Sequence, residues 1–466
     1  MTAEAPERPT RARPVRRGPA DLPFAWDAAA LASAAAEAAA EPGWLREARL
    51  AAAERYDALP VEANQLYTPY VDLRGADLSA ARPYVSVDAV ASTVERLEDA
   101  SVLVELEEDR LVRLVMSPEA RDAGVVAEPF ATALARDPDE LRIVLDAMPA
   151  LPDDKLVQLT AAAWCHGLHV HVPDGVRLDR PILVRTLLGR PDTALFARTL
   201  VRLGDGATAS FVEELLPSEE AGAEGGQALY SGTTEVALGA GARLEVASIQ
   251  ELGPRNVAFQ HRLARVGEAA DLRWALAQLG ARLVRSRVDN ELAGDRSSVE
   301  QVEIVFGSDE QLFDLTAYTR HTGRDTTGNL LAKGALLGGA RSFMKGLITI
   351  ERSAVGTDSF LGEFGMNLSK RARAVAIPSL EIDQPDCRRA AHSSSVGPID
   401  ESQVFYLESR GIPRDEARKF IVLGFLEPVV ARVAHPAAQA RLRERLEAKW
   451  DAAEGAAIDG RAPAAA

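Results

Sequence analysis

Residues 162–175, AAWCHGLHVHVPDG, hold one of the two cysteines and three of the seven histidines of the chain. Thiolate and imidazole groups bind transition metals, so Cys165, His166, His169 and His171 are candidate metal ligands. On a β-strand, Cys165, His169 and His171 would share one face, and the apolar residues between them would share the other. The ligand set is incomplete and has no carboxylate near the histidines, and a PDGV turn follows the strand directly. We therefore predict an ordinary strand with its histidines at the surface, and a metal site stays open as the alternative.

A second pair, Cys387 and His392, lies five residues apart in CRRAAHSSSVG. A neutral imidazole is a competent iron ligand and is more labile than a thiolate. Taken alone, these residues favour a histidine that hydrogen-bonds the SSSVG turn. Metal binding by His392 is the alternative.

Motifs for several other chemistries are missing from the sequence. In GNLLAKGALL, Gly334 follows Lys333 where a phosphate-binding loop needs Ser or Thr for magnesium. No G-x-G-x-x-G joins a strand to a helix, and no G-x-S-x-G elbow occurs. The sequence therefore does not resemble an ATPase, a dehydrogenase or a hydrolase.

Composition narrows the class of protein further. The net charge of −16 over 466 residues argues against nucleic acid as the main partner. The only basic run, at 8–17, is short and Pro-rich, so residues 1–20 are expected to be a disordered arm. No apolar run of about 18 residues occurs, so we expect a cytoplasmic protein without membrane partners. Two cysteines cannot supply four thiolates, so we expect this chain alone to hold no cluster stably.

Three regions would position the candidate residues. Residues 21–155 are mainly helical in pattern, with Asp27 as a helix cap, Pro42–Gly43 as a break and a strand pair in SVLVELEEDRLVRLVM. Residues 156–385 are short alternating segments, and the turn glycines Gly204, Gly239, Gly267 and Gly294 recur at intervals of 27 to 35 residues. This pattern favours a parallel β-helix, with residues 216–227 as a surface loop, although a sandwich or barrel remains open.

Helical patterns return in the third region, residues 386–466. Asp400 can cap one helix and Gly411 can end it, and Pro413 can open the next. The last helix carries Leu442, Leu446 and Trp450 on one face. That stripe needs a partner surface, either in this chain or in another.

Residues 380–425 resemble the C-terminal signature of the SufB/SufD family, the scaffold proteins of the SUF iron–sulfur cluster assembly system. The matching features are LEI at 380–382, His392 five residues before Gly397, and D-x-x-x-x-FYL-x-x-RGI from Asp400, followed by Gly424–Phe425. Upstream, EPGWLREARLAAAERYDALP and KLVQLTAAAWCHGLHVHVPDGV are similar to the helices and the β-helix entry of the family. The likeness thus covers nearly all of the chain after the arm.

Within the family the sequence is closer to the SufD branch. SufB-like proteins generally carry Glu directly after the signature His, but here Ser393 follows His392. They also carry a sulfur-accepting Cys in the last coils, whereas no cysteine occurs between 341 and 380. Many SufD proteins have Cys two residues before the His, where this chain has Ala390.

The resemblance implies a right-handed parallel β-helix between an N-terminal helical domain and a C-terminal helical domain. It implies pairing with a SufB-like subunit through the β-helix, docking of a SufC-like ATPase on the C-terminal helices, and a possible homodimer without SufB. A transient iron–sulfur cluster or iron would be shared with SufB through His392, with Cys387 as a second candidate. The candidate partner-binding residues are Phe405, Tyr406, Arg410, Gly411, Phe420 and Phe425.

Two other functions stay open at this point. A metal-free structural adaptor of the same complex would differ only in leaving His392 unused. A carbohydrate-active enzyme on a β-helix would need Asp, Arg or Lys clustered on successive coils. The sequence shows no Asp-rich coil series, so a non-catalytic scaffold is the favoured prediction.

Overall fold

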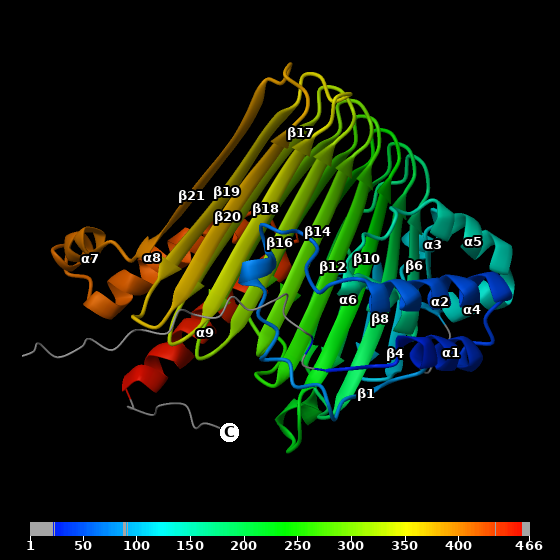
Figure 1. Ribbon diagram of the computed structural model, residues 1–466, viewed down its shortest axis with the longest axis horizontal. Helices are drawn as coiled ribbons and strands as arrows, with labels where there is room; N and C mark the ends of the chain where they lie inside the picture. Colours follow the sequence, from blue (N-terminus) through cyan, green and yellow to red (C-terminus); the bar gives the residue numbers. More distant parts are fainter. Residues whose placement is uncertain (1–21, 23, 87–89, 91, 434, 459–466) are drawn as a thin grey trace, which may run out of the picture.

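The middle of the chain coils into a parallel β-solenoid, and helices from both ends of the sequence pack beside it (Figure 1). The computed structural model describes residues 22, 24–86, 90, 92–433 and 435–458. The predicted mainly β architecture with flanking helices is therefore confirmed. The basic arm at 1–20 lies outside the described residues.

Two long sheets form the solenoid, and each coil contributes one strand to each sheet. Sheet A contains β6 (His166–Val172), β8 (Thr193–Leu203), β10 (Ala228–Leu238), β12 (Asn256–Val266), β14 (Leu283–Leu292), β16 (Leu312–His321), β18 (Arg341–Ile350) and β20 (Arg373–Ile382). Sheet B contains β7 (Ile182–Leu188), β9 (Thr208–Pro217), β11 (Arg243–Gln250), β13 (Asp271–Gln278), β15 (Ser298–Gly307), β17 (Thr327–Leu336), β19 (Asp358–Asn367) and β21 (Arg389–Pro398).

One end of the solenoid is capped. In sheet A, β5 (Val126–Pro129) pairs antiparallel with β6, and the short β1 (Arg82–Pro83) pairs with β8. In sheet B, the hairpin of β3 (Val102–Glu107) and β4 (Arg110–Met116) lies beside β7, and β2 (Thr93–Val94) follows it. The strand pair predicted in the N-terminal region therefore extends the solenoid.

Side chains alternate along each strand between the interior of the solenoid and its outer faces. On β14, Val284 and Val288 belong to the core between the sheets, whereas Leu283 packs under the N-terminal helices. Strands buried on both faces read as nearly continuous apolar runs. This burial explains the dense Val, Leu and Ala content of the solenoid.

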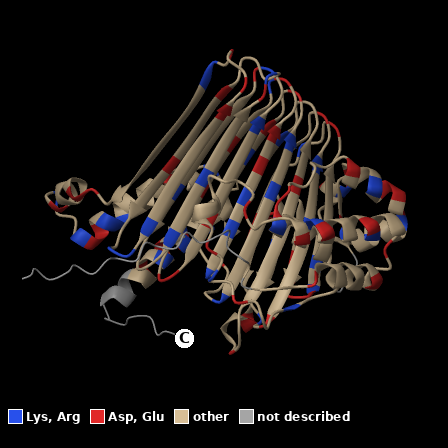
Figure 2. Cartoon of the chain, in the orientation of Figure 1, with Lys and Arg blue, Asp and Glu red and all other residues tan. Residues whose placement is uncertain are grey.

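The turns between strands need glycine because the coils stack closely. A Cβ on Gly204 would lie 2.1 Å from the Asp174 carboxylate, and one on Gly294 would lie 2.1 Å from the Glu268 amide nitrogen. Asp174 also accepts a 2.8 Å hydrogen bond from the Asp205 amide of the next coil. Equivalent carboxylates recur along this row of turns (Figure 2). The predicted turn glycines are therefore confirmed by their contacts with the preceding coil.

The N-terminal helices cover the outer face of sheet A at the capped end. Asp27 caps the first helix by accepting from the Ala30 amide, as predicted. The helices of this region are α1 (Ala28–Ala38), α2 (Gly43–Ala58), η1 (Thr68–Tyr70), α3 (Pro118–Asp122), α4 (Phe130–Arg136), α5 (Pro138–Asp146) and α6 (Lys155–Ala163). Of the loop predicted at 216–227, the first two residues belong to β9, and residues 218–227 connect β9 to β10 and contain η2 (Glu219–Gly222).

The C-terminal helices are α7 (Glu401–Glu408), α8 (Arg414–Val430) and α9 (Pro436–Ile458). Asp400 caps α7, and Gly411 adopts a φ of +89° in the turn that follows. The α9 stripe of Leu442, Leu446 and Trp450 is buried against sheet B, so its partner surface lies in this chain. No helix among the described residues is both long and apolar enough to cross a membrane.

The solenoid extends past the predicted boundary at residue 385, because β21 runs from Arg389 to Pro398. Its sequence, RAAHSSSVGP, lacks the dense apolar alternation of the earlier strands. No coil follows this strand, so most of it is exposed and needs no apolar residues. At the other boundary, α6 runs past residue 156 and the first sheet A coil strand begins at His166.

Candidate functional site at the open end of the solenoid

The histidine-rich stretch forms β6, the first sheet A strand of the coil series, as predicted. The expected surface position of its histidines is wrong, since His166 and His169 are buried. Helix α4 covers this face, and a Cβ on Gly167 would lie 2.2 Å from the Phe130 ring. The expected lack of a carboxylate is also wrong, because Glu128 lies 3.7 Å from the His169 ring.

Burial determines the protonation states of the cysteine and histidine side chains in this stretch. Burial raises the pKa of Cys165 to about 12 and lowers the pKa of His166 to about 4. A thiol that keeps its proton is a poor metal ligand. Within the described part of the chain, no three His, Cys, Asp or Glu side chains are arranged to hold a metal.

His392 lies on β21, the last strand of sheet B. Its Cα pairs with that of Leu361 on β19, and paired residues of parallel strands point to the same face. Leu361 packs between the two sheets with Ile348 and Ile350 of sheet A. His392 therefore faces the interior of the solenoid, and it is exposed because no later coil covers it.

Strand geometry does not support the alternative in which His392 hydrogen-bonds the SSSVG turn. The segment Ser393–Gly397 belongs to β21 itself. No hydrogen bond joins the His392 ring to any residue that the structure describes. The imidazole is therefore available to a ligand at the open end.

Cys387 lies in the turn before β21. Its side chain is half-buried and packs with Ala390 against the small core of the last coils. Because Ala390 and His392 are two residues apart on one strand, Cys387 lies beside the face that presents His392. The described residues nevertheless do not bring Cys387 and His392 into a closed metal site.

The sequence reasoning missed Glu363, which faces the same interior on β19. It pairs with Ser394, two residues from His392, and is 1% exposed. Its carboxylate accepts a 2.7 Å hydrogen bond from the Ile377 amide, and no described Lys, Arg or His lies within ion-pair distance. Burial raises the pKa of Glu363 to about 8. Glu363 lies two residues after Leu361 on a strand with alternating side chains, and this spacing could have indicated that it faces the interior.

The outer edges of β20 and β21 are unpaired, because these strands end their sheets. Each is ten residues long, and Ile382 and Val396 are exposed there. Edge strands present free N–H and C=O groups that can pair with another chain. The open end thus combines an apolar and backbone surface with an exposed imidazole.

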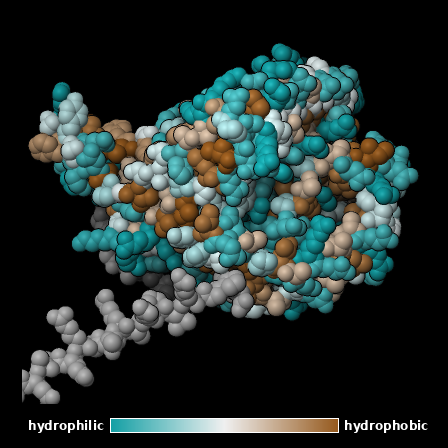
Figure 3. All heavy atoms as spheres, turned by 45° about the horizontal axis from the view of Figure 1, so that its top comes forward, coloured by the Kyte–Doolittle hydropathy of each residue, from teal (hydrophilic) through white to brown (hydrophobic). Residues whose placement is uncertain are grey.

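An apolar patch lies on the helices next to the open end. Phe405 and Tyr406 of α7 and Phe420 of α8 are 70%, 56% and 60% exposed. Figure 3 shows hydrophobic residues on the protruding end that α7 forms in Figure 1. Exposed aromatic groups of this kind mark protein-binding surfaces.

The other predicted partner-binding residues have different surroundings. The Arg410 guanidinium lies 5.1 Å from the Tyr406 ring centre, and Gly411 forms the exposed turn after α7. Phe425 is half-buried instead and packs against sheet B, where Lys333 binds its carbonyl oxygen at 2.9 Å. Five of the six residues therefore lie on the exposed surface, and Phe425 fixes α8 to the solenoid.

Comparison with known proteins agrees with this architecture. Residues 186–425 match the family described as SUF system FeS cluster assembly, SufBD core domain. The chain is 28% identical over 410 residues to iron–sulfur cluster assembly protein SufD of Bacillus subtilis (strain 168), a match that covers 84% of this chain and 90% of the relative.

Two further relatives are similar. A SufBD family protein of Staphylococcus epidermidis is 25% identical over 407 residues, which is 83% of this chain and 85% of the relative. A SufBD family protein of Mycobacterium tuberculosis is 31% identical over 236 residues, which is 49% of this chain and 59% of the relative.

Proposed function

Because this chain belongs to the SufBD family of the SUF iron–sulfur cluster assembly system, we propose that it is a SufD-like, non-catalytic scaffold subunit. It pairs with a SufB-like subunit and a SufC-like ATPase in the cytoplasm, and it takes part in iron entry into the nascent cluster. The observation that carries this proposal is His392, which faces the solenoid interior at its open end.

The open end supports pairing with the SufB-like subunit. Two ten-residue edge strands, β20 and β21, can extend both sheets into those of a second solenoid. Such pairing would cover Ile382 and Val396 and enclose His392 between the two subunits. In the absence of SufB, a second copy of this chain could occupy the same edges as a homodimer.

The ligand count supports a shared metal site. Within the described residues, this chain offers His392 and Cys387 near the open end but no closed set of three ligands. Iron accepts nitrogen, sulfur and oxygen ligands, and clusters generally take four from protein. Iron or a transient cluster held here would therefore depend on ligands from the SufB-like subunit.

The patch on α7 and α8 supports docking of the ATPase. Its aromatic side chains are exposed in this chain, whereas the opposite face of α8 is anchored to sheet B through Val422 and Leu426. A movement of the ATPase could therefore reach the last coils through a rigid connection. Phe405, Tyr406 and Phe420 would contact the ATPase, with Arg410 and Gly411 shaping the turn.

The test is anaerobic co-expression of this chain with SufB-like and SufC-like proteins from one source, comparing wild type with His392→Ala. Size exclusion reports assembly, and chemical assay reports bound iron and sulfide. We expect the variant to assemble normally and to lose iron, because an exposed side chain without hydrogen bonds contributes little to folding. Ser393→Ala, on the opposite face of β21, is the matched control and should keep its iron.

Each other outcome has a definite meaning. If His392→Ala keeps its iron, His392 is not a metal ligand. The chain is then a metal-free structural adaptor of the complex. If wild type forms no complex, the proposed partners are wrong. Cys387→Ala in the same assay decides whether the thiol contributes, and retained iron would remove it from the site. Family membership gives no support to a carbohydrate-active enzyme.

A further inference from the structure

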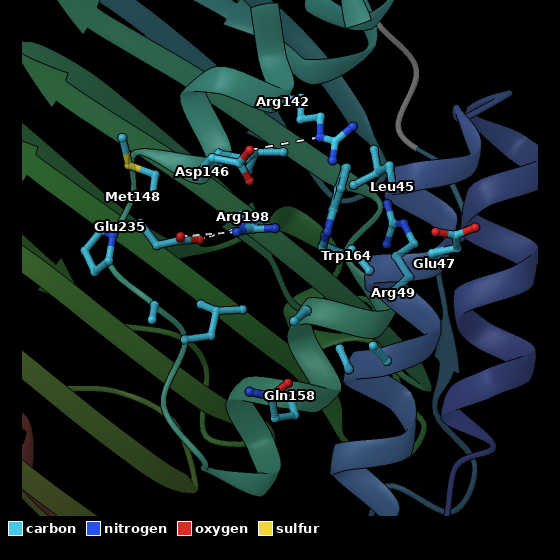
Figure 4. Close-up of a pocket in the computed structure, with 18 of the residues that line it drawn as sticks. Leu45, Glu47, Arg49, Arg142, Asp146, Met148, Gln158, Trp164, Arg198 and Glu235 are labelled. Carbon is cyan, nitrogen blue, oxygen red and sulfur yellow. Dashed lines mark hydrogen bonds and ion pairs between the residues drawn. The ribbon is translucent and has the colours of Figure 1, made fainter. Parts of the chain in front are cut away.

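Two of the cavities in this chain differ in the balance of their charged groups. One, of about 810 Å³, lies between helix α2, the segment 142–151, helix α6 and sheet A (Figure 4). Its five arginines are balanced by Glu41, Glu47, Asp146, Glu235 and Glu291, so its charge selects no ligand. The other lies inside the solenoid and is bordered by two buried glutamates.

The two glutamates stand in one column of sheet B, separated by a single alanine. Glu303 on β15 pairs with Ala332 on β17, and Ala332 pairs with Glu363 on β19. Because neighbouring strands lie about 4.8 Å apart, the backbones of the two glutamates are roughly 10 Å apart. All three residues face the interior of the solenoid, and Ala332 has no side-chain atom beyond Cβ. Space is therefore left between the two carboxyl groups.

A cavity of about 10 Å³ occupies this space, which is about the smallest volume that admits one water molecule. Ala317 of β16 and Ala332 border it and stay partly exposed, although both face the interior. Small side chains on strands of the two sheets have thus left a gap in an otherwise filled core. Gln301 and Met344 line the same gap.

Neither carboxyl group forms an ion pair with a cation that the structure describes. Glu303 and Glu363 are 2% and 1% exposed. Glu303 accepts a 3.0 Å hydrogen bond from the side-chain amide of Gln278. Glu363 accepts at Oε2 from the Ile377 amide, and no described residue donates to its Oε1. Burial raises the pKa of both groups, so each holds its proton more firmly than it would in water.

Two buried cations in this region are bound to other carboxylates. Arg262 donates to Glu213 at 2.9 Å. Lys345 borders the cavity, but its Nζ lies 2.6 Å from Asp314 on the outer side of sheet A. A dication between the two glutamates would supply the missing positive charge. Two carboxyl protons leave as it binds, so the net charge of the buried site stays at zero.

The donor set decides the class of dication. Glu303 and Glu363 offer carboxylate oxygens, Gln301 offers an amide oxygen, and Met344 offers a thioether sulfur. Mg²⁺ retains several water molecules and Ca²⁺ takes about six to eight oxygen ligands, and a gap for one water-sized particle accommodates neither arrangement. Transition-metal dications accept both carboxylates and soft sulfur ligands, and Zn²⁺ shows that a small ligand set can hold them.

We infer that the solenoid interior binds one transition-metal dication between Glu303 and Glu363. Gln301 and Met344 complete its ligands. The ion reaches the gap from the open end, past Ser394, which is the next residue of the same column and is exposed. The site lies apart from His392 and needs no partner subunit, so it is independent of the function proposed above.

Equilibrium dialysis of the full-length chain against Co²⁺, a transition-metal dication that is stable in air, tests the inference by counting the ions bound per chain. At a free Co²⁺ concentration of about 0.1 mM, Glu303→Gln and Glu363→Gln should each bind one ion fewer than wild type. Glu381→Gln removes an exposed carboxyl on β20 and is the matched control, which should bind as many ions as wild type. With Mg²⁺ in place of Co²⁺, wild type and the variants should not differ.

Ala332→Val tests the gap itself, because the added methyl groups fill it and leave both carboxyl groups in place. This variant should also bind one Co²⁺ fewer than wild type. Thermal melts verify that every variant is folded. Equal Co²⁺ counts in wild type and Glu363→Gln, or in wild type and Ala332→Val, overturn the inference, and so does an equal loss of Mg²⁺.

A comparison in the background of His392→Ala separates this site from the open end. The double variant His392→Ala/Glu363→Gln should bind one Co²⁺ fewer than His392→Ala alone. If the two bind equally, the ion that Glu363→Gln loses is held at His392, and the inference is overturned while the proposed function is not.

Discussion

A buried carboxyl without a cation is the most unusual single residue at the open end. Glu363 faces the solenoid interior and holds its proton up to a pKa of about 8 because burial disfavours the charged form. Since the unfolded chain loses this proton near pH 4.3, the unfolded state binds fewer protons between about pH 4.3 and 8. Stability contributed at Glu363 therefore falls as pH rises through that range.

Replacing the carboxyl by its neutral isostere should remove this pH dependence. We expect Glu363→Gln to match wild type near pH 4 and to be more stable by about 2–4 kcal/mol near pH 8.5. Urea unfolding at the two pH values measures the difference. Glu381→Gln, an exposed residue on the neighbouring strand β20, should leave both values unchanged. An equal effect of Glu363→Gln on stability at both pH values would contradict the raised pKa of Glu363.

Residue-level predictions from the sequence depend on local spacing. His392 was singled out because its spacing from Gly397 and Asp400 resembles a family signature, and its role in metal binding stays a prediction. The surroundings of His169 were not found, because Glu128 lies 41 positions earlier and reaches it only through the antiparallel pairing of β5 with β6. Burial and long-range neighbours of this kind are properties of the packed chain.

At the scale of elements, helix α6 is fixed to sheet A by a buried ion cluster. Asp154 caps α6 through the Leu156 and Val157 amides and also binds Arg285 and Arg287 of β14. Burial by itself would raise the pKa of Asp154, but the two guanidinium groups outweigh it and hold the pKa well below its usual range. One carboxylate thus starts the helix and pairs with both arginines, of which Arg287 is also paired with Asp289.

The charge of this cluster can be tested separately from the cap. Asp154→Asn keeps a good capping group, but it leaves the buried Arg285 guanidinium without its paired carboxylate, while Arg287 keeps Asp289, so we expect a loss of about 3–5 kcal/mol. Asp137→Asn makes the same change from a carboxylate to an amide at the exposed N-cap of α5, where no buried arginine is present. It should cost less than about 0.5 kcal/mol in the same denaturant titration. Similar losses in both variants would show that capping alone is involved.

Elements were predictable where one local rule dominates. The turn glycines and helix caps follow from steric fit and from hydrogen bonding to exposed amides, so the coils and most helix starts are visible in the sequence. Strand β21 was assigned to the helical region instead, because an edge strand with an exposed face does not carry an apolar alternation. The path of residues 59–84 across sheet A depends on distant contacts such as Tyr67 with the Gly346 carbonyl.

At the scale of the whole molecule, the capped end and the open end of the solenoid both expose apolar side chains. Ile382 and Val396 at the open end are 45% and 39% exposed, and Val94 and Val112 at the capped end are 41% and 43% exposed. We expect Ile382→Lys/Val396→Lys to abolish association with the SufB-like subunit, because charges would be buried in the interface. Val94→Lys/Val112→Lys is the matched control and should associate normally.

Light scattering coupled to size exclusion measures this association. Both double variants should melt within a few degrees of wild type, since the replaced side chains are exposed in the single chain. Normal association of the open-end variant would mean that the subunits meet elsewhere. Loss of association in the capped-end variant would show that the interface includes the capped end, contrary to the proposal.

The contrast between the two ends also fixes how many subunits can line up. A solenoid with two open ends would accept neighbours without limit and grow into a filament. Here β5, the β3–β4 hairpin and the N-terminal helices close one end, so each chain can be extended in one direction only. Two such chains that join open end to open end leave only their capped ends outward, where the sheets finish in the short strands β5 and β2, so we expect growth of the stack to end at a pair.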